Sequence, residues 1–135
     1  MMGATIEVLE FSEWRNLASK LLLERAKLSD GGWAYFFLAR IGDDEAGLLV
    51  LDLLDRPPCA FIREIFVVPI YRRNRVGATL LAHAEMVARR NHLPMLRLEA
   101  YPLDDGTSRE FLTRWYLRNG FSVEHGRADR MAKAL

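Results

Sequence analysis

The stretch from Ala60 to Asn91 constrains the fold most, because a strand-like run, a basic loop and an amphipathic helix follow one another directly. Ala60 to Val68 is mostly apolar and stops at Pro69, which cannot continue a central strand. From Val76 onward, apolar residues recur at helical spacing as far as Asn91. A buried strand that leads into a helix of this kind predicts a sheet with helices packed on its faces.

Periodicity and turn signals predict the other elements. In chain order, the other elements are a strand at 6–9, a helix at 14–28, a hairpin of strands at 33–41 and 47–54, a strand at 95–101, a helix from residue 107, and short strands at 121–125 and 130–135. Ser12 would cap the first helix, and Thr107 with Glu110 has the capping-box spacing for the last. The predicted fold class is α/β (α+β), with a mixed central sheet flanked by helices.

Composition bounds the class of protein. The 135 residues, half of them hydrophobic, suffice for one domain over residues 1–135 with its own core. Cys59 is the only cysteine, which excludes an internal disulfide and a thiolate zinc cluster, and a reducing, cytoplasmic location is expected. With a net charge of +1, the domain as a whole is not attracted electrostatically to nucleic acid or to a membrane surface. We expect neither a signal peptide nor a membrane span, because no suitable apolar run occurs.

The basic loop before the second helix predicts an anion-binding site. Residues 70–79 read IYRRNRVGAT and lead straight into that helix. The first turn of a helix leaves its N–H groups unpaired and carries about half a positive charge. Gly77 and Ala78 would let a phosphate approach the backbone, and Arg72, Arg73 and Arg75 would attract it. The segment therefore suits a diphosphate better than a neutral ligand.

Two other interpretations of this loop stay open on residue type alone. A basic loop before a helix is commonly a solvated cap, and three arginines also suit nucleic-acid phosphates. One short patch on a nearly neutral domain offers few phosphate contacts, so nucleic acid is the less favoured interpretation.

The spacing V-x-P-x-x-R-x-x-x-x-G from Val67 to Gly77 resembles the acetyl-CoA signature of the GCN5-related N-acetyltransferase (GNAT) superfamily, R/Q-x-x-G-x-G/A. The resemblance implies the acyl-CoA N-acyltransferase fold and acetyl-CoA as cosubstrate, with no metal. The cofactor-binding residues that it implies are Val67, Val68, Arg72, Arg73, Asn74, Arg75, Val76, Gly77, Ala78 and Thr79, the two valines through their backbone groups. Arg75 departs from the signature, since it stands where the family has its first glycine and a left-handed backbone there would cost energy.

The last predicted helix resembles a second signature of the same family, a tyrosine followed four residues later by Gly-Phe. Here these residues are Tyr116, Gly120 and Phe121. The resemblance places Tyr116 at the thioester sulfur, where a phenol can protonate or solvate the departing thiolate. Without the resemblance, Trp115 and Tyr116 would simply belong to the apolar face of the helix.

An acidic side chain is predicted to take the proton of the acceptor amine. An alkyl ammonium is only about one part in a thousand neutral at pH 7, so a proton acceptor is needed. Glu64 and Glu99 are the candidates, and Glu64 is preferred because it lies on the strand that resembles the cofactor-binding strand. The alternative is a structural ion pair of the glutamate with Arg63 or Arg97.

These features predict an N-acetyltransferase that moves an acetyl group from acetyl-CoA to a primary amine by direct attack in a ternary complex. The acceptor would be an amine-bearing small molecule or a protein or peptide amine, with no nucleic-acid or membrane partner, and a homodimer is compatible with this function. The alternative is a nonenzymatic acyl-CoA-binding sensor or protein-interaction module on the same fold, which the Arg75 departure motivates.

Overall fold

The computed structural model describes residues 5–104 and 106–135, which form seven strands and three α-helices. The strands are β1 (Ile6–Phe11), β2 (Tyr35–Ile41), β3 (Asp44–Asp55), β4 (Pro58–Val67), β5 (Met95–Glu99), β6 (Ser122–Glu124) and β7 (Arg127–Ala134). The helices are α1 (Lys20–Leu28), α2 (Val76–Arg90) and α3 (Arg109–Arg118), with single 3-10 turns η1 (Trp14–Asn16) and η2 (Pro69–Tyr71). The predicted class, a mixed sheet flanked by helices, is confirmed. In this part of the chain, none of the helices is both long and apolar enough to span a membrane.

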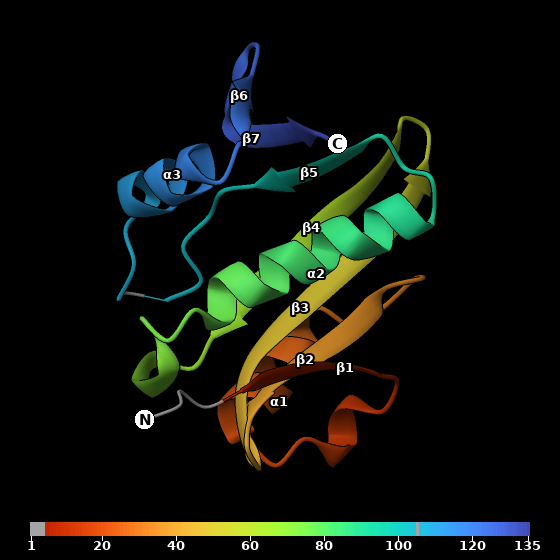
Figure 1. Cartoon of the computed structure of the whole chain (residues 1–135). Coiled ribbons are helices and arrows are strands. Elements are labelled where there is room, and N and C mark those ends of the chain that lie inside the picture. The colour runs from red at the N-terminus through yellow and green to blue at the C-terminus, as the bar shows by residue number, and fades with distance from the viewer. Residues whose placement is uncertain (1–4, 105) are drawn as a thin grey trace.

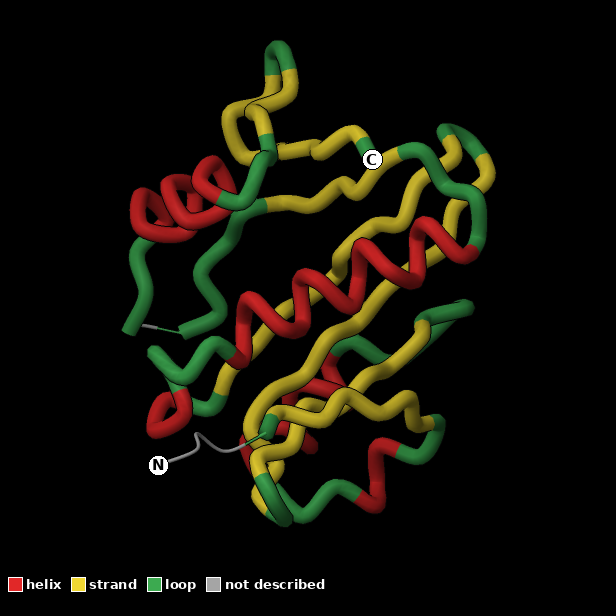
Figure 2. Tube along the Cα trace, viewed as in Figure 1, coloured by secondary structure: helices red, strands yellow, loops and turns green. Residues whose placement is uncertain are grey.

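The strands form one sheet in the order β1-β2-β3-β4-β5-β7-β6. Only β4 and β5 run parallel among the described neighbours, and α2 is the crossover that connects them. Figures 1 and 2 show α2 crossing one face of the sheet, α3 beside the β5 and β7 end, and α1 behind the sheet.

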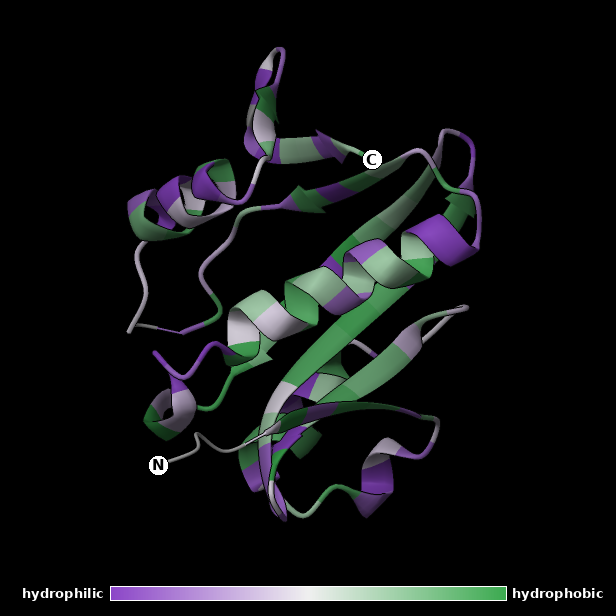
Figure 3. Ribbon diagram, viewed as in Figure 1, coloured by the Kyte–Doolittle hydropathy of each residue, from purple (hydrophilic) through white to green (hydrophobic). Residues whose placement is uncertain are grey.

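Two cores hold these layers together. One joins α2 and α3 to the sheet, and the other joins α1 to the opposite face. Figure 3 shows the central strands β3 and β4 as largely hydrophobic. Gly47 of β3 sets the close approach of α2, because a Cβ there would lie 2.9 Å from the Val76 side chain. This contact fixes where α2 begins relative to the sheet.

A bulge in β4 and the early end of its pairing with β5 create a gap in the sheet. Val50 pairs with Glu64 and Leu51 with Ile62, so Arg63 is the extra residue of a β-bulge. The pairing of β4 with β5 ends at Ile62 and Leu98, although β4 continues to Val67. The two strands therefore separate toward the start of α2, as Figure 2 shows.

Two helix starts differ from the predicted ones. The first helix begins at Lys20, and Ser19 caps it by accepting a hydrogen bond from the Leu22 N–H; Ser12 is not the cap. Ser108, and not Thr107, caps α3. Both differences move a predicted start toward the C-terminus without changing the order of the elements.

Candidate active site

A cleft of about 1040 Å³ opens where β4 and β5 separate. It is lined by both strands, the start of α2, the segment between β5 and α3, and α3 itself. The predicted site residues that line it are Glu64, Val67, Arg72, Arg73, Arg75, Val76, Gly77, Ala78 and Tyr116. Val68, Asn74 and Thr79 lie outside this lining. The fold thus brings segments that are far apart in the sequence to one cavity.

The start of α2 presents free peptide N–H groups. The Thr79 N–H donates to the Arg75 carbonyl at 2.9 Å, and the Thr79 hydroxyl donates to the same carbonyl at 2.7 Å. The N–H groups of Val76, Gly77 and Ala78 have no acceptor among the described residues, and no side chain caps the helix. The 15-residue helix adds its dipole to these donors. Free donors at the start of a long helix are the features that the predicted anion site requires.

Arg75 adopts the left-handed backbone that its place in the loop requires. Its φ is 65° and its ψ 14°, and Arg73 also has a positive φ of 72°. For a residue with a Cβ, this conformation costs about 1–2 kcal/mol. The loop therefore has at Arg75 the left-handed conformation that a glycine would adopt without strain, and the arginine makes this conformation less favourable.

Replacing Arg75 with glycine is expected to raise the free energy of unfolding by about 0.5–1 kcal/mol, since relief of strain exceeds the entropy that glycine gains in the unfolded chain. Urea unfolding measures the change. Arg75→Ala is the control, because it removes the same charge but keeps a Cβ at a positive φ. Equal stability of the two variants would contradict the assignment of strain.

Arg72 is a structural residue of the cleft wall. Its Nε donates to the Val67 carbonyl at 3.0 Å, and its Nη2 lies 2.6 Å from Asp104 Oδ2. This guanidinium holds the pKa of the Asp104 carboxyl below its usual value. Arg73 and Arg75 are exposed and have no ion pair among the described residues. The charge of Arg72 is therefore paired within the protein, whereas those of Arg73 and Arg75 face solvent.

The backbone of β4 offers hydrogen-bonding groups to the cleft. Val68 is fully engaged, because its N–H donates to the Ala46 carbonyl at 2.9 Å and its carbonyl accepts from Tyr71 at 2.8 Å. Peptide groups alternate in direction along an antiparallel strand, so those of Val67 and Ile65 face away from β3 and toward the gap, where the Val67 carbonyl already accepts from Arg72. Sequence reasoning missed Ile65, since only the register after the bulge identifies it.

Tyr116 connects α3 with the same cleft. Its ring contacts Trp115 and Phe121 edge-on, with ring centres 4.9 and 5.3 Å away. Burial raises the pKa of its hydroxyl, which keeps the phenol protonated. Among the described residues, every fully buried polar side-chain atom has a hydrogen-bond partner. The Tyr116 hydroxyl has none among these residues, so it is not fully buried, and Tyr116 lines the cleft. Trp115 also lies 3.5 Å from the position of a Cβ on Gly77, so α3 packs directly on the anion site.

Glu64 is held by α1. Arg25 donates from Nε to Oε2 and from Nη2 to Oε1, both at 2.8 Å, and the Ser29 hydroxyl donates to Oε1 at 3.0 Å. The alternative of a structural ion pair is confirmed for Glu64. The partners named for it were wrong, because Arg63 binds Asp52 and Arg97 binds Glu124. Glu64 lines the cleft, but few of its acceptor positions remain free.

Other reactive side chains add little to the cleft. Burial raises the pKa of the Cys59 thiol. His83 packs against the Phe37 ring, and burial lowers its pKa. Residues 5–104 and 106–135 contain no group of three or more His, Cys, Asp or Glu side chains that could hold a metal. Neither Cys59 nor His83 lines the cleft.

Solved structures of several acetyltransferases share this fold. The PaiA N-acetyltransferase from Thermoplasma acidophilum, in complex with coenzyme A, is 17% identical with a TM-score of 0.67, covering 97% of this chain and 99% of its own. An IAA acetyltransferase from Bacillus cereus is 20% identical with a TM-score of 0.71, covering 97% and 100%. A GNAT acetyltransferase from Staphylococcus aureus is 18% identical with a TM-score of 0.64, covering 97% and 99%. These likenesses show the fold.

A search among curated proteins gave no match. The sequence itself matches the acetyltransferase (GNAT) family over residues 4–121, which is most of its length. Because the match covers most of the chain, the chain belongs to the acetyltransferase (GNAT) family.

Proposed function

We propose that the protein binds acetyl-CoA in the cleft between β4 and β5 and transfers its acetyl group to a primary amine by direct attack in a ternary complex. The observation that carries this proposal is that one cleft joins the free amides of α2, the unpaired edge of β4 and the hydroxyl of Tyr116. Membership of the GNAT family supports acetyl transfer in general.

The cleft suits the parts of acetyl-CoA in order. The amides of Val76, Gly77 and Ala78 would take the pyrophosphate, with Arg73 and Arg75 adding charge. The pantetheine arm would follow the free edge of β4 as an added strand. Its amides would meet the peptide groups that face the gap. This course would bring the thioester toward Tyr116.

Direct transfer needs an amine lone pair to attack the thioester carbon while the C–S bond breaks. Tyr116 would stabilise the departing thiolate by donating a hydrogen bond to sulfur. Full proton transfer from an ordinary phenol to a thiolate is uphill by roughly 2 kcal/mol. Burial raises the pKa of Tyr116 and widens this gap, so hydrogen-bond stabilisation is the larger contribution.

An activity screen with acetyl-CoA tests the proposal. Small amines, aminoglycosides and peptide N-termini are offered as acceptors, and release of free coenzyme thiol is followed. We expect thiol release that depends on both the enzyme and an amine. Binding of acetyl-CoA without thiol release across the panel would contradict acetyl transfer and favour the acyl-CoA-binding sensor.

A further inference from the structure

Glu99 stands at the point where β4 and β5 separate. The last paired residues are Ile62 and Leu98, so Glu99 is the first residue of β5 beyond the pairing. Leu98 and Ala100 belong to the core beneath α2 and α3. Because side chains alternate along a strand, Glu99 points to the opposite face, where α1 contacts Glu64. The two glutamates therefore lie on one face, on either side of the gap, and Tyr116 lies on the other.

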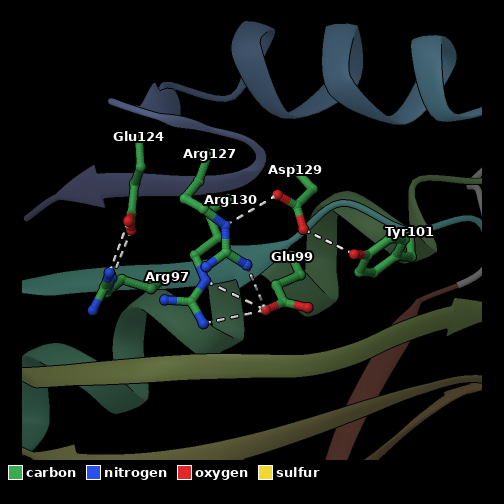
Figure 4. A network of polar contacts seen from close by, with 7 residues as sticks. All are labelled: Arg97, Glu99, Tyr101, Glu124, Arg127, Asp129 and Arg130. Carbon is green, nitrogen blue, oxygen red and sulfur yellow. Dashed lines mark hydrogen bonds and ion pairs between the residues drawn. The ribbon is translucent and has the colours of Figure 1, made fainter.

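The two carboxylates differ in free hydrogen-bonding capacity. Glu64 uses both oxygens in three hydrogen bonds from α1 and the residue after it, and its side chain is only 4% exposed. In Glu99, Arg130 reaches Oε1 with two nitrogens at 3.3 Å, and Arg127 lies 4.0 Å from the same oxygen. Oε2 of Glu99 has no partner in the described part of the chain, and the side chain lines the cleft at 31% exposure. Figure 4 shows the dashed lines meeting at one oxygen of Glu99 only.

The surrounding network holds Glu99 in this orientation. The Tyr101 hydroxyl donates to Asp129 at 2.8 Å, and the Ala100 N–H donates to the Asp129 carbonyl at 2.8 Å. These bonds tie the start of β7 to the residues that follow Glu99, as Figure 4 shows for the side chains. Arg130, which pairs with Glu99 across the two strands, is thereby held against Oε1. The second oxygen is left for a ligand in the cleft.

We propose that Glu99 takes the proton of the acceptor amine, an assignment that rests on the proposed acetyl transfer. Oε2 of Glu99 takes one proton from the acceptor ammonium, which frees the nitrogen lone pair that forms the C–N bond with the thioester carbon. The second proton that this nitrogen loses as the amide forms passes to water. The C–S bond breaks, its electron pair leaves on the coenzyme thiolate, and Tyr116 stabilises that thiolate from the other face. The protonated Glu99 then gives its proton to water. Glu64, the base preferred from the sequence, would instead tie α1 to β4 beside the gap.

Two small acceptors separate a proton-accepting role from a structural one. Near neutral pH methylamine is protonated, whereas hydroxylamine is neutral and needs no base to become nucleophilic. In Glu99→Gln, kcat/KM with methylamine is expected to fall about 100-fold, while the rate with hydroxylamine changes far less. Glu99→Asp keeps a carboxylate and is expected to recover part of the methylamine rate.

Two further variants serve as controls. Glu124→Gln removes another arginine-paired carboxylate of the same network, one outside the cleft lining, and should leave both rates unchanged. Glu64→Gln should lower both rates by a similar factor. Equal effects of Glu99→Gln on the two acceptors, or a selective loss in Glu64→Gln, would overturn the assignment to Glu99. A wild-type protein that acetyl-CoA stabilises but that acetylates neither of these amines nor any other acceptor of the panel would instead overturn the proposed transfer.

Discussion

Gly77→Asp is expected to abolish the stabilisation that acetyl-CoA gives the wild-type protein. Gly77 is the second residue of α2, and its free N–H is one of the three proposed phosphate donors. A carboxylate there would occupy these donors and repel the pyrophosphate by about 3–4 kcal/mol at close range. The loss in affinity is then about 100-fold or more. At a concentration of about 100 Kd, acetyl-CoA should stabilise the wild type by about 2.7 kcal/mol, and thermal unfolding measures this shift.

Gly77→Ala is the matched control for the effect of added bulk. A Cβ at this position would meet Trp115 at 3.5 Å and Val67 at 3.7 Å, which are ordinary contacts. Alanine should therefore keep most of the stabilisation by acetyl-CoA. The aspartate variant should itself fold well, because an acidic residue favours the first turn of a helix. A full acetyl-CoA shift in Gly77→Asp would exclude the start of α2 as the phosphate site.

Tyr116→Phe is expected to lower turnover by about 10- to 100-fold while leaving acetyl-CoA binding nearly unchanged, because a hydrogen bond to a charged group contributes about 1.5–3 kcal/mol. The hydroxyl would act only after the C–S bond begins to break, so its loss should appear in kcat and not in the affinity for the cofactor. Steady-state thiol release gives kcat, and thermal shift gives binding.

Phenylalanine preserves the packing of Tyr116, since both aromatic neighbours contact the ring. The melting temperature without ligand should therefore change little. Trp115→Phe controls for a change in packing of α3, because it replaces the neighbouring ring near Gly77 with a smaller one. This variant keeps the Tyr116 hydroxyl. Unchanged kcat in Tyr116→Phe would remove this hydroxyl from the mechanism.

The free amides at the start of α2 could be predicted from the sequence because their determinants are local. Pro69 ends the strand region, the arginines follow, and the helix starts within a few residues, so no distant contact is needed to place the free amides. The order of elements was predictable for the same reason, since each strand and helix carries its own periodicity. The signature identified Arg75 as the position where a positive φ would cost energy, and the structure has that conformation there.

The remaining features depend on contacts between distant residues. The start of α1 is set by Glu45, whose carboxylate accepts the N–H groups of Ala18 and Ser19 at 3.1 and 2.6 Å. Arg25, the partner of Glu64, lies 39 residues away, whereas sequence reasoning considered an adjacent arginine and one on a neighbouring strand. The bulge at Arg63 depends on the register with β3. These contacts arise from tertiary packing and leave no local pattern in the sequence.

A crystal structure of the protein with coenzyme A tests the central claim most directly. We predict that pyrophosphate oxygens accept hydrogen bonds from the N–H groups of residues 76–78 and that the pantetheine arm lies along β4, with its sulfur near Tyr116. Coenzyme A bound elsewhere, or the start of α2 occupied by side chains of the protein while coenzyme A is bound, would contradict the claim.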